Sequence, residues 1–331
     1  MMWKRPAFWL TLQVGVTLAL LVLLFETFDW RAFGVLFARL PVSAYLASLL
    51  VVLAGQLLYA WRWRMVLRAG NVPVRFREVF SQYLIGMFVG NFLPSTVGGD
   101  VAKVYLLGRN HGYGPITASV VLDRMFGFGL AAMLAACALV MAAPTAPVLR
   151  LVRTVLVLVA AATVLGSGVA LAGTGGLARR VARFGPRVTG WADALQRFRL
   201  SVLTAVRSPR VLLHAVGTVV VYFVLLSLVY RLLIVIMCGR QLGLLETLMV
   251  VTSVSVMSNL PISLNGLGVR EQLHVVLFEP LGVPKEVSVA VSLLLFSHTL
   301  LISVVGGALW MRSSRARTPL SPPRDTEAQP P

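Results

Sequence analysis

Two stretches far apart in the chain, NFLPSTVGGDVAK at residues 91–103 and NLPISLNGLGVRE at residues 259–271, follow the same order of residue types. Each begins with asparagine, continues through Leu-Pro and a short run to a pair of glycines, and ends in charged residues. Each closes an apolar segment, at about 79–97 and about 244–264. Because proline and glycine break helices, each stretch predicts a helix that ends inside an apolar region, followed by a second helix beside charges.

Six uninterrupted apolar segments surround these two stretches. They lie at about 8–28, 42–60, 116–143, 151–172, 211–237 and 286–311. A helix of about 20 apolar residues crosses a membrane. The whole chain is 58% hydrophobic and 13% charged, whereas soluble domains carry about 25% charged residues. This composition excludes an ordinary soluble enzyme and predicts an all-α integral membrane protein.

The charged residues are strongly basic, with 30 Lys and Arg against 12 Asp and Glu. Such a balance often indicates nucleic-acid binding, but here the arginines flank the apolar segments, as they do in cytoplasmic loops. The basic regions are the N-terminus 1–7, the stretch 61–78, the loop 174–210 and the tail 312–331. We therefore expect no nucleic-acid partner, and we expect both termini in the cytoplasm.

All four basic regions can lie in the cytoplasm only if each interrupted segment enters and leaves the membrane on the same side. We therefore predict six full spans plus two re-entrant helical hairpins. Residues 8–143 and 151–311 then each contain span, span, hairpin and span. Three crossings per half is an odd number, so the two halves form an inverted repeat, which is typical of alternating-access transporters.

The basic loop 174–210 leaves two interpretations open. Apolar residues recur at helical spacing along 191–206, which favours a surface helix against anionic lipid. A plain connecting loop is equally compatible with the sequence. The tail 312–331 is rich in proline and polar residues, which predicts disorder.

The two hairpins predict a binding site for an anionic group. A helix that starts inside the membrane exposes N–H groups and a partial positive charge. Glycine lets a ligand approach the backbone closely, and proline ends the first helix. The polar, glycine and proline candidates are Asn91, Pro94, Gly98, Gly99, Asn259, Pro261, Asn265, Gly266 and Gly268.

Ionisable residues inside the membrane are the second part of this prediction. They are Asp100, Lys103, Asp123, Arg124, Glu246, Arg270 and Glu271, and each is costly there unless it is paired or faces water. We expect Asp100 or Asp123 to pair with Arg270, and Glu271 to pair with Arg124 or Lys103. These pairs would either bind a ligand or only hold the halves together. The aromatic residues Tyr59, Trp61 and Trp63 predict an interface anchor.

Motifs for other chemistry are missing from the sequence. The four histidines have no metal-ligand spacing, and there is no G-x-S-x-G or Walker A sequence. We expect no catalytic residues, no metal and no cofactor.

The motifs together resemble a known family. The hairpin NFLPSTVGGDVAK with Tyr105-Leu106-Leu107-Gly108, the sequence VVLDR at 120–124 and the stretch NLPISLNGLGVRE are similar to the lysylphosphatidylglycerol synthase transmembrane region, or flippase-like domain. The resemblance covers residues 8–312. It implies translocation of an aminoacylated phospholipid across the bacterial inner membrane, although other members are associated with polyprenyl-linked sugars or hopanoids. This chain carries Asp at 100 and 123, where the family often has Glu.

The sequence thus favours flippase-like translocation of an anionic phospholipid or a polyprenyl-phosphate-linked lipid. The aminoacyl-transferring domain of the family is absent from the sequence, so we expect a separately encoded lipid-modifying enzyme as a partner. One alternative is a membrane glycosyltransferase with a polyprenyl-phosphate donor, for which Asp29, with Glu26 nearby, is the acidic candidate. Another is a non-catalytic scaffold in a lipid or cell-envelope pathway.

Overall fold

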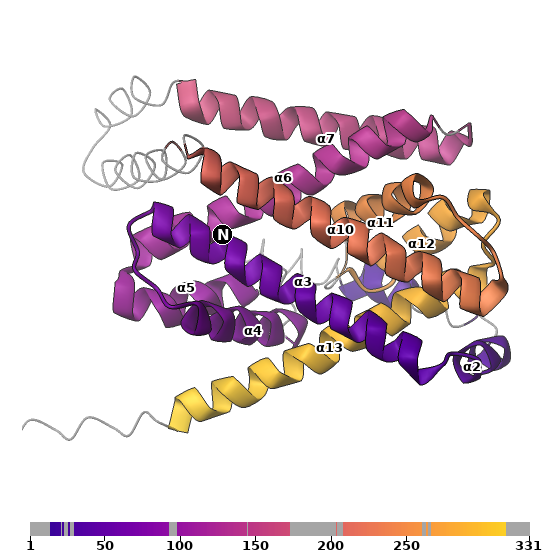
Figure 1. The fold of residues 1–331 in the computed structure, drawn as a ribbon, viewed down its shortest axis with the longest axis horizontal. Coiled ribbons are helices and arrows are strands. Elements are labelled where there is room, and N and C mark those ends of the chain that lie inside the picture. The colour runs from indigo at the N-terminus through magenta and orange to yellow at the C-terminus, as the bar shows by residue number, and fades with distance from the viewer. Residues whose placement is uncertain are drawn as a thin grey trace, which may run out of the picture.

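The computed structural model describes residues 14–20, 22, 26, 30–92, 98–143, 145–172, 203, 208–259, 263 and 266–315. Over these residues the protein is helical and has no β-strand (Figure 1), which confirms the all-α prediction. The helices are α2 (Trp30–Ala38), α3 (Val42–Ala69), α4 (Phe76–Phe92), α5 (Gly98–His111), α6 (Tyr113–Ala142), α7 (Pro147–Ala172), α10 (Pro209–Cys238), α11 (Leu244–Ser258), α12 (Val269–Phe278) and α13 (Lys285–Arg315), with a 3₁₀ turn at Glu279–Leu281.

Five of the described helices are long and apolar enough to cross a membrane. They are α3, α6, the Pro147–Leu165 part of α7, α10 and α13, and they match five of the six predicted spans. The first predicted span, about 8–28, falls largely outside the described residues, as do the proposed surface helix at 191–206 and most of the tail. These three predictions stay predictions.

One boundary was wrong. Helix α3 continues to Ala69, whereas we expected the span to end near residue 60 and a basic loop to begin there. Arginine is a good helix former, so the basic residues do not end the helix. As a result, Arg62 is carried on a long helix and is 5% exposed.

The interrupted segments form two pairs of short helices, α4 with α5 and α11 with α12. Helices α4 and α5 pack tightly along each other. A side chain at Gly99 of α5 would collide with the backbone of Gly86 in α4, and Gly90 also lies against Gly99. The absence of a Cβ at Gly99 therefore allows α5 to return along α4.

Each short helix pair packs on a long helix from the other half of the chain. Helix α4 packs on α13, and α11 packs on α6, while α3 and α10 run beside each other (Figure 1). Gly306 of α13 leaves no room for a side chain against the backbone of Leu84 in α4. Both pairs are thus enclosed by long helices, and α7 covers the outer side of α6 (Figure 1).

Candidate functional site

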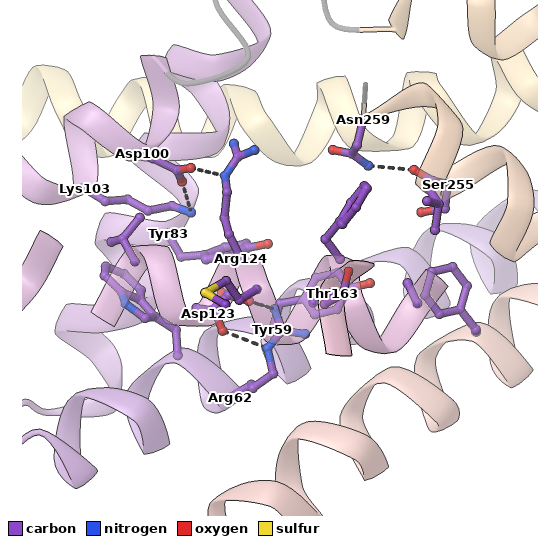
Figure 2. Close-up of a pocket in the computed structure, with 18 of the residues that line it drawn as sticks. Tyr59, Arg62, Tyr83, Asp100, Lys103, Asp123, Arg124, Thr163, Ser255 and Asn259 are labelled. Atoms are coloured by element: carbon purple, nitrogen blue, oxygen red, sulfur yellow. Dashed lines mark hydrogen bonds and ion pairs between the residues drawn. The ribbon is translucent and has the colours of Figure 1, made fainter. Parts of the chain in front are cut away.

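A cavity of about 580 Å³ lies where α3, α5 and α6 meet α11 (Figure 2). Five charged residues line this first cavity: Arg62 from α3, Asp100 and Lys103 from α5, and Asp123 and Arg124 from α6. Ser255 of α11 and Asn259, the residue that follows the end of α11, lie on the other side of the cavity in the same view. Four of the predicted charged residues are therefore brought together, and Arg62 joins them.

Asp100 is the centre of the first charged group. It stands in the first turn of α5, where a negative charge is favoured by the helix dipole. Its carboxylate accepts a hydrogen bond from Lys103 Nζ at 3.2 Å and a second one from Arg124 Nε. Lys103 Nζ also lies 4.5 Å from the ring centre of Tyr83. Arg124 extends from α6 with half of its side chain exposed, so a ligand can reach it.

Arg62 and Asp123 form the second charged group, which joins α3 to α6. Arg62 Nε donates to Asp123 Oδ1 at 2.7 Å and Arg62 Nη2 donates to Oδ2 at 3.1 Å. The two side chains are only 6% and 13% exposed. Arg62 Nη1 is shielded from solvent and has no hydrogen-bond partner among the described residues. A buried N–H without a partner is costly, and an oxygen of a ligand in this cavity would satisfy it.

The charges of the first cavity do not cancel. It is lined by three cations and two carboxylates, which leaves a formal charge of +1. Surplus charge among apolar helices is unfavourable unless an opposite charge compensates it. The arrangement therefore favours binding of a singly charged anion such as a phosphodiester.

A side pocket of about 180 Å³ extends the first cavity along α4 and α5. It shares Tyr83, Asp100, Lys103, Arg124 and Asn259 with the first cavity, and Asn91 and Gly99 also line it. Of the predicted polar and glycine candidates, Asn91, Gly99 and Asn259 therefore lie beside the charged group.

The predicted ion pairs between the halves are wrong. Asp100 and Asp123 pair within the first half, and Arg270 pairs with its neighbour Glu271 at 2.5 Å. Glu271 is 1% exposed and also accepts hydrogen bonds from Ser292 Oγ and from the backbone N–H of Gly268. The physical reason is reach: Arg270 and Glu271 lie together at the start of α12, whereas Asp100 and Asp123 have cations on their own or adjacent helices.

The N-terminus of α12 also differs from the prediction of an open anion site. The carboxylate of Glu271 already places a negative charge at this helix end. Gly268 has a φ of +78°, and a side chain there would collide with Leu20. Gly266 lies against the carbonyl of Ser258. These two glycines therefore allow close packing against neighbouring parts of the chain, and they do not leave space for a ligand. Pro94, Pro261 and Asn265 fall outside the described residues, and Gly98 begins α5.

The aromatic residues near the end of α3 do not form the predicted interface anchor. Trp63 is 1% exposed and donates from Nε1 to Ser119 Oγ at 3.1 Å, and Tyr59 lines the first cavity. Only Trp61 of the three is substantially exposed.

Sequence reasoning missed Arg62 because it was assigned to a cytoplasmic loop. The available signal was Asp123: an acidic residue within a span requires a cation close by.

Comparison with known proteins agrees with this architecture. Residues 10–307 match the family described as the lysylphosphatidylglycerol synthase transmembrane region. A segment of 121 residues is 30% identical to the UPF0104 membrane protein PH1989 of Pyrococcus horikoshii. That match covers 35% of this chain and 36% of the relative, so it spans about a third of each protein.

Proposed function

Because the chain belongs to the family of lysylphosphatidylglycerol synthase transmembrane regions, we propose that it translocates an anionic lipid across the membrane. The substrate class is a phospholipid or a polyprenyl-phosphate-linked lipid. The observation that carries the proposal is the first cavity, where Arg62, Lys103 and Arg124 outnumber the two carboxylates.

The chemistry of the cavity fits a lipid phosphate. A phosphodiester carries one negative charge and oxygens that accept hydrogen bonds from guanidinium and ammonium groups. Arg62 Nη1 and the half-exposed Arg124 supply such donors. A volume of about 580 Å³ lies in the range of pockets for small ligands and headgroups. The acyl or prenyl chains would stay in the bilayer.

The helix arrangement supports alternating access by two inverted halves. Helices α3, α4–α5 and α6 correspond in order to α10, α11–α12 and α13. The contacts also correspond, because α4 packs on α13 while α11 packs on α6. In this proposal the two short helix pairs are re-entrant hairpins, and rocking of the halves exposes the headgroup site to each side in turn.

The rest of the proposal concerns the cell. The protein lies in the inner membrane with both termini in the cytoplasm, and a separately encoded lipid-modifying enzyme supplies or consumes the lipid. The chain needs no cofactor of its own for this task, since moving a headgroup between leaflets requires binding and conformational change.

A transport assay tests the proposal. The full chain is reconstituted into vesicles with phosphatidylglycerol that carries a fluorophore on one acyl chain, and a reductant that cannot cross the membrane quenches the outer leaflet. We expect the wild type to expose inner-leaflet lipid at least tenfold faster than empty vesicles. Arg124→Gln should lose most of this rate, because it removes a cation that ligand can reach.

The matched control is Arg210→Gln, which removes an exposed arginine that lines neither the first cavity nor the side pocket. It should transport like the wild type. If Arg124→Gln is as active as Arg210→Gln, the assigned site is wrong. If the wild type moves no anionic lipid, the glycosyltransferase and scaffold alternatives take the place of this function.

A further inference from the structure

A separate cavity of about 290 Å³, here called the second cavity, lies in the other half of the molecule. Residues from α10, α11, α12 and α13 line it, together with Val52 of α3. Arg270 is the one arginine, lysine or carboxylate in the described lining of this cavity. The proposed function uses the first cavity and gives the second cavity no task.

Arg270 is held with its charge facing the second cavity. Its Nε and Nη2 donate to Glu271 Oε1 at 3.0 and 2.5 Å, and its guanidinium lies 4.1 Å from the ring centre of Phe296. Glu271 itself is buried and does not line the cavity. Arg270 Nη1 makes no hydrogen bond within the described part of the chain. The cation is thus oriented while one of its donor groups stays available.

The last turn of α11 separates the second cavity from the first. Asn259 lines the first cavity, the side pocket and the second cavity, and Ser255 lines the first and the second. Ser258 lines the side pocket and the second cavity. The wall between the first and second cavities therefore contains polar side chains from the end of α11.

Ser258 provides an independent sign of a ligand. Its Oγ is shielded from solvent and has no hydrogen-bond partner among the described residues. Ser253, in the same helix, shows the usual pattern for a buried serine: its Oγ donates to Met249 O at 2.5 Å. A shielded hydroxyl without a partner between two cavities is satisfied when an oxygen-rich group lies beside it.

We propose that the second cavity is a second anion subsite built around Arg270, and that a lipid phosphate passes between the first and second cavities along Ser258 and Asn259. This inference rests on the proposed function for its substrate class. It adds a two-position path: Arg124, Lys103 and Arg62 hold the anion on one side of the last turn of α11, and Arg270 holds it on the other.

Occupancy of the second subsite can be measured without transport. Phenylglyoxal condenses with accessible arginine side chains, and peptide mass spectrometry measures its reaction with Arg270. We expect phosphatidylglycerol in detergent micelles to slow modification of Arg270 at least fivefold, while phosphatidylcholine has little effect. Soluble glycerol phosphate in place of the lipid distinguishes a lipid headgroup from a free phosphate compound as the ligand. If it protects Arg270 as well as phosphatidylglycerol does, the subsite binds a free phosphate compound and the proposed lipid path is overturned.

The passage is tested by substitutions at Ser258. Ser258→Leu should narrow the path and reduce transport of fluorescent phosphatidylglycerol at least tenfold, while binding of this lipid, measured by native mass spectrometry, stays within threefold of the wild type. Ser258→Ala removes only the hydroxyl and should reduce transport by a smaller factor. Ser297→Leu, at a half-buried serine of α13 that lines none of the three cavities, is the control.

The outcomes separate the two proposals. If the wild type transports lipid but Arg270 is not protected, or if Ser258→Leu transports like Ser297→Leu, the second subsite is overturned and the proposed function stands. If Arg270 is protected by phosphatidylglycerol but the wild type transports nothing, the subsite stands as a binding site and the passage and the function fall. Absence of both protection and transport rejects both proposals.

Discussion

The charged residues of the two halves are arranged differently although their motifs match. In the first half, carboxylates pair across helices: Asp100 of α5 contacts Arg124 of α6, and Asp123 of α6 contacts Arg62 of α3. In the second half, Arg270 and Glu271 are neighbours on α12 and pair with each other. The first half therefore keeps a surplus cation at an open cavity, whereas the second half neutralises its carboxylate internally.

This difference shows what a repeated motif does and does not determine. The Asn, Pro and Gly pattern sets the break between two short helices in both halves. The partners of each charge depend on what the neighbouring long helix supplies. Helix α6 contributes the charged residues Asp123 and Arg124 in the first half. In the second half, α13 contributes the uncharged Ser292, which contacts Arg270 and Glu271. The same hairpin pattern can thus carry a charged group with a surplus cation or one in which the cation and the carboxylate balance.

The largest expected effect is loss of the buried pair that joins α3 to α6. Asp123→Asn leaves the charge of Arg62 uncompensated at a side chain that is 6% exposed. Breaking a buried ion pair by removing one partner costs about 3–5 kcal/mol. We expect a clear fall in the midpoint of thermal unfolding of the detergent-purified protein.

The control for this variant is Glu78→Gln, which removes the partner of His111 at a partly exposed pair 3.3 Å apart. Such pairs contribute at most about 1 kcal/mol. An equal fall in midpoint for the two variants would show that burial does not distinguish the Arg62–Asp123 pair.

The second prediction contrasts the closed charge group with the open one. Glu271→Gln weakens hydrogen bonds to Arg270 and to the start of α12 and should lower stability by about 1.5–3 kcal/mol. Asp100→Asn lies beside the half-exposed Arg124 and should change stability less. The amount of phosphatidylglycerol that the purified protein retains, measured by native mass spectrometry, should change more in Asp100→Asn than in Glu271→Gln. If both variants alter binding equally, the halves are not functionally different.

Much of the fold could be predicted from the sequence, but little of the pairing could. Long apolar runs determine the spans, and the breaks at 91–103 and 259–271 determine the short helices, because both signals are local. The partner of Asp123 depends on how α3 and α6 face each other, which no local signal reports. Arg62 shows the limit most clearly: the expected span ends near residue 60, but α3 continues to Ala69. This difference decides whether the arginine is a topology signal in a loop or part of a site.

The third prediction concerns the contact between α13 of one half and α4 of the other. Gly306→Ala places a methyl group against the backbone of Leu84, and overpacking of this kind costs about 1–3 kcal/mol. Gly217→Ala in α10 is the control, since a side chain there meets nothing within 4 Å. Thermal unfolding should show a lower midpoint for Gly306→Ala alone. A similar midpoint for both variants would mean that α4 and α13 adjust easily and that the halves are only loosely interlocked.

The smallest expected effect on stability concerns the Tyr230–His274 hydrogen bond in the second half, next to the backbone of Arg270. Tyr230 O–H and His274 Nε2 are 2.7 Å apart, and the ring Nδ1 of His274 lies 2.7 Å from the carbonyl oxygen of Arg270. Because a carbonyl oxygen can only accept a hydrogen bond, Nδ1 of His274 donates to it and the hydroxyl of Tyr230 donates to Nε2. These two hydrogen bonds position the backbone of Arg270. Tyr230→Phe should cost about 1 kcal/mol of stability and reduce protection of Arg270 from phenylglyoxal by phosphatidylglycerol about twofold. Tyr222→Phe, at a second tyrosine that lines the second cavity, should leave that protection unchanged, and an equal loss in both variants would show that the cavity wall, not the Tyr230–His274 bond, holds Arg270 in place.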